Sequence, residues 1–127
     1  MKNKAFRVLL IEPDRDSLIM EKRLISSIDF VQEITALPTP LAALSIIRPE
    51  NNFSVIFTCV HTPLLSGFDF MKSLSKRDLL GIPVIMISTD QNARDKAIEC
   101  GAFAFLLKPL ELSEIKETLA QAKSMIS

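Results

Sequence analysis

Five short runs of β-branched and aliphatic residues alternate along the chain with five segments that are compatible with helices. This alternation predicts a parallel sheet whose helical connections cover both of its faces. Several of the runs are almost entirely apolar, as strands covered on both faces must be. The fold class is therefore α/β, with strands expected at Phe6–Ile11, Val31–Thr35, Ser54–Thr58, Pro83–Ser88 and Ala104–Leu107.

Capping residues mark the starts of the first two helices. Asp14 or Asp16 can serve as the N-cap of the first helix. Thr39 can cap the second, and Pro40 then takes the first helical position, where a missing N–H costs nothing. Apolar residues at helical spacing are Met20, Leu24 and Ile28 on one face of the first helix, with Leu18 and Ile25 beside them, and Leu41, Leu44 and Ile47 in the second.

The other three helices are expected from about Phe68 to Leu74, from about Asn92 to Cys100 and from Ser113 to about Met125. Gly101 supplies a left-handed residue that stops the fourth helix. Ser113 is expected to cap the last one, with Glu114 and Glu117 in the first turn, where a carboxylate meets the positive end of the helix dipole. The stretches Pro49–Phe53 and Arg77–Ile82 are expected to be loops.

Composition limits the class of protein. The 127 residues suit one domain, and residues 1–127 are treated as a single one. With 15 basic and 15 acidic residues and no long Lys/Arg run, this domain is not expected to bind nucleic acid. No apolar run is long enough to span a membrane and no signal-peptide cleavage pattern is present, so we expect a soluble intracellular protein, cytoplasmic or nuclear, without membrane contact. Cys59 and Cys100 form no metal-ligand cluster and are expected to be reduced.

In an open parallel sheet, functional residues gather at the carboxyl ends of the central strands, where the strand order reverses. The loops that follow the expected strands begin at Glu12, Cys59, Ser88 and Lys108. Together these four loops resemble the site of the receiver domains of response regulators, and the resemblance runs in order along nearly the whole chain. It is carried by VLLI-Glu12-Pro13-Asp14, VIFT-Cys59-VH-Thr62-Pro63-LLS-Gly67, PVIMI-Ser88-Thr89 and GAFA-Phe105-LL-Lys108-Pro109.

This resemblance implies a doubly wound (βα)5 fold of the flavodoxin/CheY-like kind. With right-handed crossovers, its five-stranded parallel sheet has the order 2-1-3-4-5. Helices one and five are then expected on one face of the sheet, and helices two, three and four on the other.

The resemblance also implies the site, and here the chain departs from the family. Receivers hold Mg²⁺ with a pair of acids and with the aspartate that accepts phosphate. This chain has Glu12 in the first acid position, Pro13 in the second and Cys59 where the acceptor should be. Proline offers no side-chain ligand and a thiol is a poor ligand for Mg²⁺. We therefore expect no metal site, no cofactor and no phosphotransfer to position 59.

Three further site positions carry residues with definite expectations. Ser88 and Lys108 keep their family positions, and Phe105 takes that of the aromatic residue in the family's switch. A buried lysine requires a partner, and Glu12 is the expected counter-charge for Lys108. Phe105 has no hydroxyl, so hydrophobic transfer alone should keep it buried.

The leading interpretation is a pseudo-receiver that cannot be phosphorylated, is not an enzyme, and acts as an interaction module in a phosphorelay or in transcription control. By resemblance, it would contact protein partners through the face of the fourth helix, fifth strand and fifth helix, with a homodimer as one option. The alternative is a thiol redox sensor that uses Cys59, which could equally be an inert apolar filler. Residual phosphoryl chemistry on Ser88 is ranked last, because no base or metal cluster supports it. His61 is interpreted as a loop residue.

Overall fold

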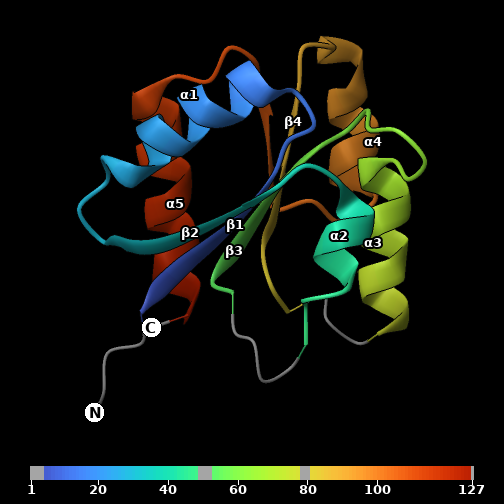
Figure 1. The fold of residues 1–127 in the computed structure, drawn as a ribbon, viewed down its shortest axis with the longest axis horizontal. Coiled ribbons are helices and arrows are strands. Elements are labelled where there is room, and N and C mark those ends of the chain that lie inside the picture. The colour runs from blue at the N-terminus through green and yellow to red at the C-terminus, as the bar shows by residue number, and fades with distance from the viewer. Residues whose placement is uncertain (1–4, 49–52, 78–80, 127) are drawn as a thin grey trace.

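A five-stranded parallel sheet forms the centre of the molecule. The structure, a computed structural model, describes residues 5–48, 53–77 and 81–126, so most of the two expected loops around residues 49–53 and 77–82 lies outside the described residues. The strands are β1 (Phe6–Ile11), β2 (Val31–Leu37), β3 (Val55–Cys59), β4 (Val84–Ser88) and β5 (Ala104–Leu107). All neighbouring strands run parallel, in the order β2-β1-β3-β4-β5. The predicted α/β fold and strand order are thus confirmed (Figure 1).

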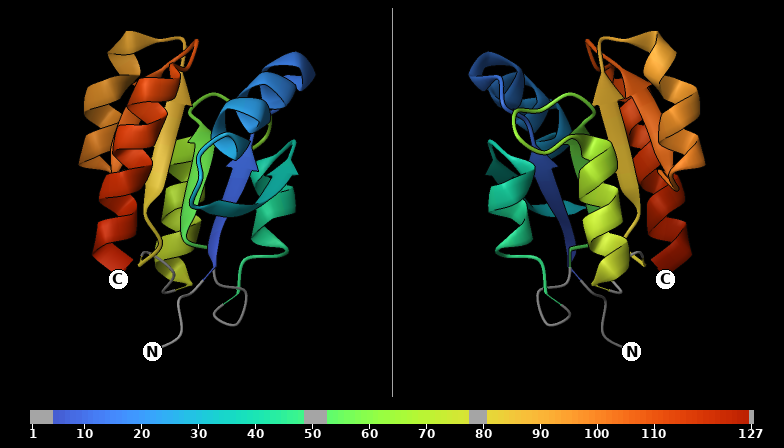
Figure 2. Two further views of the ribbon diagram at one scale, coloured as in Figure 1. Left: turned by 90° about the vertical axis from the view of Figure 1, so that its left-hand side faces the viewer. Right: turned by 90° about the vertical axis from the view of Figure 1, so that its right-hand side faces the viewer.

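Helices cover both faces of this sheet. Within the described residues they are α1 (Arg15–Ser26), α2 (Pro40–Leu44), α3 (Gly67–Lys76), α4 (Arg94–Glu99) and α5 (Leu112–Ile126), with the short 3₁₀ helix η1 (Gln91–Ala93) before α4. As predicted, α1 and α5 lie on one face and α2, α3 and α4 on the other (Figures 1 and 2). None of these helices is both long enough and apolar enough to cross a membrane.

The side chains of the strands alternate between two apolar layers, one on each face of the sheet. Val8 and Leu10 belong to the layer with α1 and α5, whereas Leu9 and Ile11 belong to the layer with α2, α3 and α4. The same alternation along β3 places Cys59 in the layer with α1 and α5. Every residue of β3 and β4 is buried, because these central strands are covered on both sides.

Capping confirms the predicted starts of the first two helices. Asp14 accepts a hydrogen bond from the backbone N–H of Ser17 at 2.9 Å, so it is Asp14 and not Asp16 that caps α1. Thr39 accepts one from the N–H of Ala42 at 3.1 Å, and Pro40 stands at the first position of α2. Each cap satisfies a backbone N–H that has no partner within its helix.

The end of α4 agrees with the prediction, whereas the start of α5 differs from it. Gly101 has φ +103° and follows α4, as predicted for a left-handed stop. By contrast, α5 begins at Leu112, one residue earlier than predicted. The Glu111 carbonyl accepts a helical hydrogen bond from the N–H of Ile115 at 3.0 Å. Ser113 therefore lies inside the helix and is not its cap.

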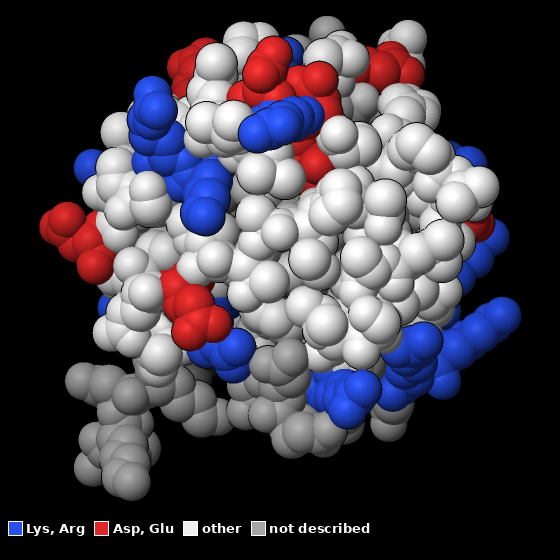
Figure 3. All heavy atoms as spheres, viewed as in Figure 1, with Lys and Arg blue, Asp and Glu red and all other residues white. Residues whose placement is uncertain are grey.

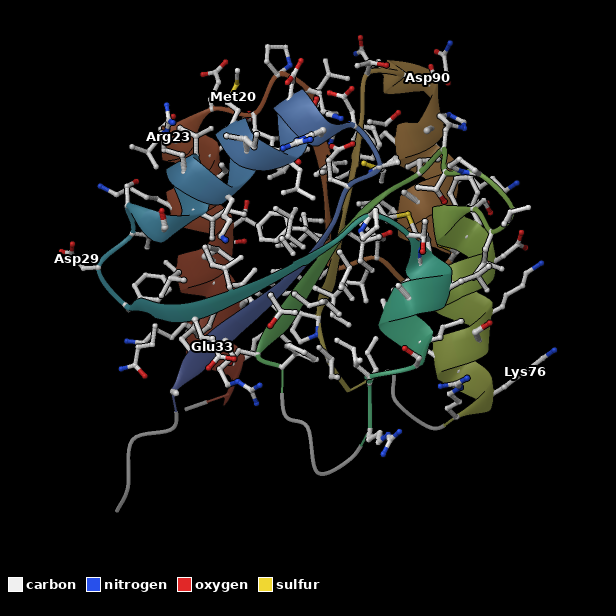
Figure 4. All side chains as sticks on the ribbon, in the orientation of Figure 1. Met20, Arg23, Asp29, Glu33, Lys76 and Asp90 are labelled. Atoms are coloured by element: carbon white, nitrogen blue, oxygen red, sulfur yellow. The ribbon has the colours of Figure 1, made fainter. Side chains whose placement is uncertain are left out.

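The inner face of α1 also differs from the prediction. Met20 is 58% exposed and projects outward from the helix, as Arg23 does (Figure 4). The buried residues of α1 are Glu21 and Ile25, which are four positions apart and so share one side of the helix. The prediction was wrong for Met20 alone, since Ile25 and Ile28 are buried and Leu18 and Leu24 pack against the same apolar layer. It also assigned only apolar residues to this face, whereas a carboxyl group with a partner can occupy it.

Candidate functional site

Four loops meet at the carboxyl edge of the sheet, toward which the arrows of β1, β3 and β4 point in Figure 2. Glu12 directly follows β1, Cys59 and Ser88 are the last residues of β3 and β4, and Lys108 directly follows β5. The strand order reverses between β1 and β3, so this edge is where the topology favours a functional crevice.

Glu12 is 1% exposed, and both of its carboxylate oxygens accept hydrogen bonds. Oε1 accepts from Nζ of Lys108 at 2.6 Å, and Oε2 accepts from the backbone N–H of Asp14 at 3.0 Å. Burial raises the pKa of Glu12, but the hydrogen bonds, that from Lys108 above all, outweigh it and hold the pKa below its usual value. The predicted pair of Glu12 and Lys108 is confirmed.

A second carboxylate, from Glu21 on α1, reaches the same ammonium. Its Oε2 lies 3.6 Å from Nζ of Lys108, whereas its buried Oε1 has no hydrogen-bond partner among the described residues. Burial, followed by the hydrogen bond and charge of Glu12, raises the pKa of Glu21 to about 8. At neutral pH this carboxyl group is therefore mostly protonated.

The sequence reasoning missed Glu21. A signal was available, because Glu21 stands four positions before Ile25 and three after Leu18, so it shares their side of the helix. What the sequence does not display is the partner that makes its burial tolerable.

The Lys108 ammonium is the centre of this cluster. Burial lowers the pKa of Lys108. The hydrogen bond to Glu12 and the interactions with Cys59, Glu12 and Glu21 raise it by more, so that the pKa of Lys108 lies above its usual value. At neutral pH the crevice therefore contains a protonated Lys108 beside an ionised Glu12 and a mostly protonated Glu21. The peptide bond between Lys108 and Pro109 is cis.

Cys59 is buried at the end of β3, and its thiol faces the same cluster. Burial raises the pKa of this thiol above its usual value, and the charge of Glu12 raises it further, while Lys108 lowers it by less. Both dominant influences favour the neutral thiol.

Among the hydrogen bonds of the described residues, none joins Ser88 to this cluster, and Phe105 belongs to the apolar layer with α2, α3 and α4. Ser88 is buried, and its hydroxyl oxygen accepts a hydrogen bond from the backbone N–H of Asp90 at 3.0 Å. Phe105 is buried, as predicted, with the guanidinium carbon of Arg94 5.2 Å from the centre of its ring. The hydroxyl of Ser88 is thus engaged with its own loop.

Pro13 and His61 lie outside the buried cluster. Pro13 is exposed, and His61 is an exposed loop residue, as predicted, 3.7 Å from a carboxylate oxygen of Asp90. No group of three or more His, Cys, Asp or Glu residues in the described part of the chain is arranged to hold a metal ion. Two carboxyl groups from the described residues, those of Glu12 and Glu21, lie against Lys108.

A profile of the response regulator receiver domain family matches residues 8–120. The chain belongs to this family. It is 32% identical over 120 residues to protein-glutamate methylesterase/protein-glutamine glutaminase 3 of Burkholderia thailandensis, covering 91% of this chain and 32% of that protein. It is also 32% identical over 117 residues to two-component response regulator-like APRR3 of Arabidopsis thaliana, covering 89% of this chain and 23% of that protein. The receiver domain thus spans less than a third of either relative.

Solved structures show the same fold. The receiver domain of the Francisella response regulator 1452 superposes with a TM-score of 0.83 at 22% identity, covering 95% of this chain and 98% of that one. The chemotaxis response regulator CheY4 of Vibrio cholerae superposes with a TM-score of 0.77 at 21% identity, covering 94% and 99%. This chain is therefore a receiver domain of the type found in two-component signalling, as the resemblance implied.

Proposed function

We propose that this receiver domain is a pseudo-receiver, which regulates through protein contacts and does not accept phosphate at position 59. The observation that carries the proposal is the buried Cys59 thiol at the end of β3, in the position that the family gives to its phosphate-accepting aspartate. A thiol that stays protonated is a poor nucleophile and a poor ligand for Mg²⁺.

The surroundings of Cys59 support the same conclusion. Phosphoryl transfer requires a cation that spreads the charge of the transferring group. In this crevice Glu12 is already paired with Lys108 at 2.6 Å, and Pro13 has no side-chain donor. Compared with the family's site, the nucleophile at position 59 and the metal ligand at position 13 are therefore both missing.

Labelling with a small phosphodonor tests this proposal. Acetyl phosphate with Mg²⁺ should add no phosphoryl group to the wild-type domain, as measured by intact mass. Cys59→Asp alone should be labelled only weakly, because Pro13 still removes a ligand. The double variant Pro13→Asp/Cys59→Asp is the positive control, in which both carboxylates are restored. Robust labelling of the wild type, or of Cys59→Asp alone, would contradict the proposal.

We include in this proposal a partner-binding face formed by α4, β5 and α5. Ile98 on α4 and Leu107 on β5 are exposed hydrophobic residues there. With a second copy of the domain as the partner, Ile98→Glu should weaken self-association in sedimentation experiments. With a response regulator or a kinase as the partner, Ile98→Glu should weaken binding to that protein. Leu41→Glu on α2 is a matched control, since Leu41 is exposed to the same degree as Ile98. Equal effects of both variants would exclude this face.

Charge supports a protein partner over a nucleic acid. The net charge is zero. On the face shown in Figure 3, basic side chains gather at the lower right, acidic side chains gather mainly along the top, and both signs occur on the left. The methylesterase activity that names the Burkholderia relative is not assigned to this chain, which spans 32% of that protein. The domain is proposed to have no enzymatic activity of its own, and its role in a phosphorelay or in transcription control is part of the same proposal.

A further inference from the structure

Three ionisable side chains from separate parts of the fold meet in the crevice. Glu12 comes from the end of β1, Glu21 from the middle of α1, and Lys108 from the loop between β5 and α5. Nζ of Lys108 lies 2.6 Å from Glu12 and 3.6 Å from Glu21. Both carboxyl groups are almost fully buried, and the lysine side chain is only 16% exposed.

This arrangement needs an explanation, because buried charges destabilise a fold unless they are paired. A single carboxylate would neutralise Lys108, yet two carboxyl groups face it. The second, Glu21, is directed inward from a helix whose outer side is open to water, and its Oε1 finds no partner within the described residues. Two inward carboxyl groups around one cation are what a small oxygen-seeking ion would use.

We propose that Lys108 is the built-in cation of the crevice, held between Glu12 and Glu21 in the place that a divalent ion would otherwise take. The ammonium then links Glu21 on α1 to the loop before α5 without any metal. The positions of α1 and of this loop therefore do not change when Mg²⁺ is added. This inference rests on the proposed function in one respect, namely that the crevice has no phosphotransfer role that requires the metal. Glu21 is the residue that distinguishes a built-in cation from a simple ion pair of Glu12 and Lys108.

The first test observes the ammonium directly in the folded wild-type domain. A lysine ammonium that is buried and hydrogen-bonded exchanges slowly with water, so Lys108 should give a ¹⁵N-detected NMR signal that exposed lysines lack. Glu21→Gln should shift this signal or broaden it, because it removes one of the two carboxyl groups. Glu117→Gln, an exposed change on α5, is the control and should leave the signal unchanged. An unchanged signal in Glu21→Gln overturns the inference.

The second test removes the cation and asks whether a metal replaces it. Millimolar Mg²⁺ should leave the melting temperature of the wild type unchanged, since a ligand stabilises only by binding the folded state. Lys108→Met should instead gain about 4 °C in saturating Mg²⁺. Lys108→Met/Glu21→Gln should lose this gain, and Lys116→Met on the exposed side of α5 should never show it. A Mg²⁺ response in the wild type, or none in a folded Lys108→Met, overturns the inference.

These results are separable from those of the phosphodonor experiment. If Lys108→Met does not fold, the NMR comparison of wild type and Glu21→Gln still decides the matter, because neither protein loses the lysine. A wild type that is labelled by acetyl phosphate while its Lys108 signal still depends on Glu21 would refute the proposed function and leave the held ammonium in place. A wild type that acetyl phosphate does not label, and whose Lys108 signal does not depend on Glu21, would support the proposed function and refute the held ammonium.

Discussion

Gly67, the first residue of α3, packs against the backbone of Cys59 at the end of β3. A Cβ atom at position 67 would lie 2.7 Å from the carbonyl oxygen of Cys59 and 3.2 Å from Cα of Val60. Both neighbours are backbone atoms, so neither can rotate away. The N–H of Gly67 also donates to the carbonyl of Val60 at 2.9 Å, which fixes the helix at this point. The absence of a side chain on Gly67 therefore sets the distance between α3 and the crevice.

We expect Gly67→Ala to lower the free energy of unfolding by about 1–3 kcal/mol, the usual cost of forcing extra atoms into a packed site. Urea denaturation measures this change. Gly81→Ala is the matched control, since a Cβ there would have nothing within 4 Å, and it should be neutral or slightly stabilising. If the two variants behave alike, the close packing of Gly67 has no energetic consequence.

The pair of Glu12 and Lys108 should contribute far more stability than a surface pair of the same kind. Glu12→Gln leaves the buried ammonium without its closest anion and should cost about 2–4 kcal/mol, with Glu21 limiting the loss by ionising in its place. Glu33→Gln breaks the pair with Arg7, in which Glu33 is 55% exposed, and should cost less than about 1 kcal/mol. Denaturation of both variants in the same buffer measures the difference. A loss in Glu12→Gln as small as that in Glu33→Gln would show that the crevice is better solvated than its geometry indicates.

The stability of the domain should fall as the pH rises through the neutral range, because of Glu21. Its pKa is about 8 in the fold against an ordinary 4.5, so between these values the folded state retains a proton that the unfolded state has released. Burial and the neighbouring Glu12 raise the pKa of Glu21, and Lys108 lowers it by less. The Cys59 thiol stays neutral over this pH range and adds no charge. The expected slope is at most about 1.4 kcal/mol per pH unit, which corresponds to one proton.

Glu12 acts in the opposite direction. Its lowered pKa contributes stability above the ordinary value of 4.5 that is lost as the pH falls through the folded value. Together the two carboxyl groups place maximum stability near about pH 5. Urea denaturation across this range checks the curve, and Glu21→Gln should remove the decline toward alkaline pH while Glu117→Gln keeps it. A flat profile in the wild type would show that Glu21 titrates normally.

The sequence predicts the fold well, because the information is local and redundant. Central strands buried on both faces are apolar throughout, as in β3 and β4, and caps such as Asp14 and Thr39 mark where the first two helices begin. The ends of elements are harder to predict. Strand β2 continues two residues beyond Thr35 to Leu37, whose carbonyl accepts a hydrogen bond from the N–H of Glu12 at 3.0 Å. That extension depends on the neighbouring strand.

The site is predictable only where charge requires a partner. A lysine at the carboxyl edge of the sheet needs an anion, so the pair of Lys108 and Glu12 follows from the order of the loops. Glu21 does not follow, because its burial depends on neighbours from distant parts of the chain: burial and Glu12 keep its carboxyl group mostly protonated, and Lys108 lies 3.6 Å away. The exposure of Met20 has the same cause, since the side of α1 that carries Glu21 is turned inward in its place.

The thiol of Cys59 should be slow to react in the folded domain. Burial raises its pKa and the charge of Glu12 raises it further, while Lys108, already paired with Glu12, offsets little of this. Because the thiolate is the reactive species, alkylation should require opening of the crevice. In Cys100→Ala, where Cys59 is the one remaining cysteine, alkylation should be at least about 100-fold slower than that of Cys100 in Cys59→Ala. Cys100 lies at the end of α4 and is only partly buried. Rapid alkylation of Cys59 below about pH 7, together with fast oxidation by peroxide, would instead favour the redox sensor, since both reactions require a thiolate that this environment disfavours.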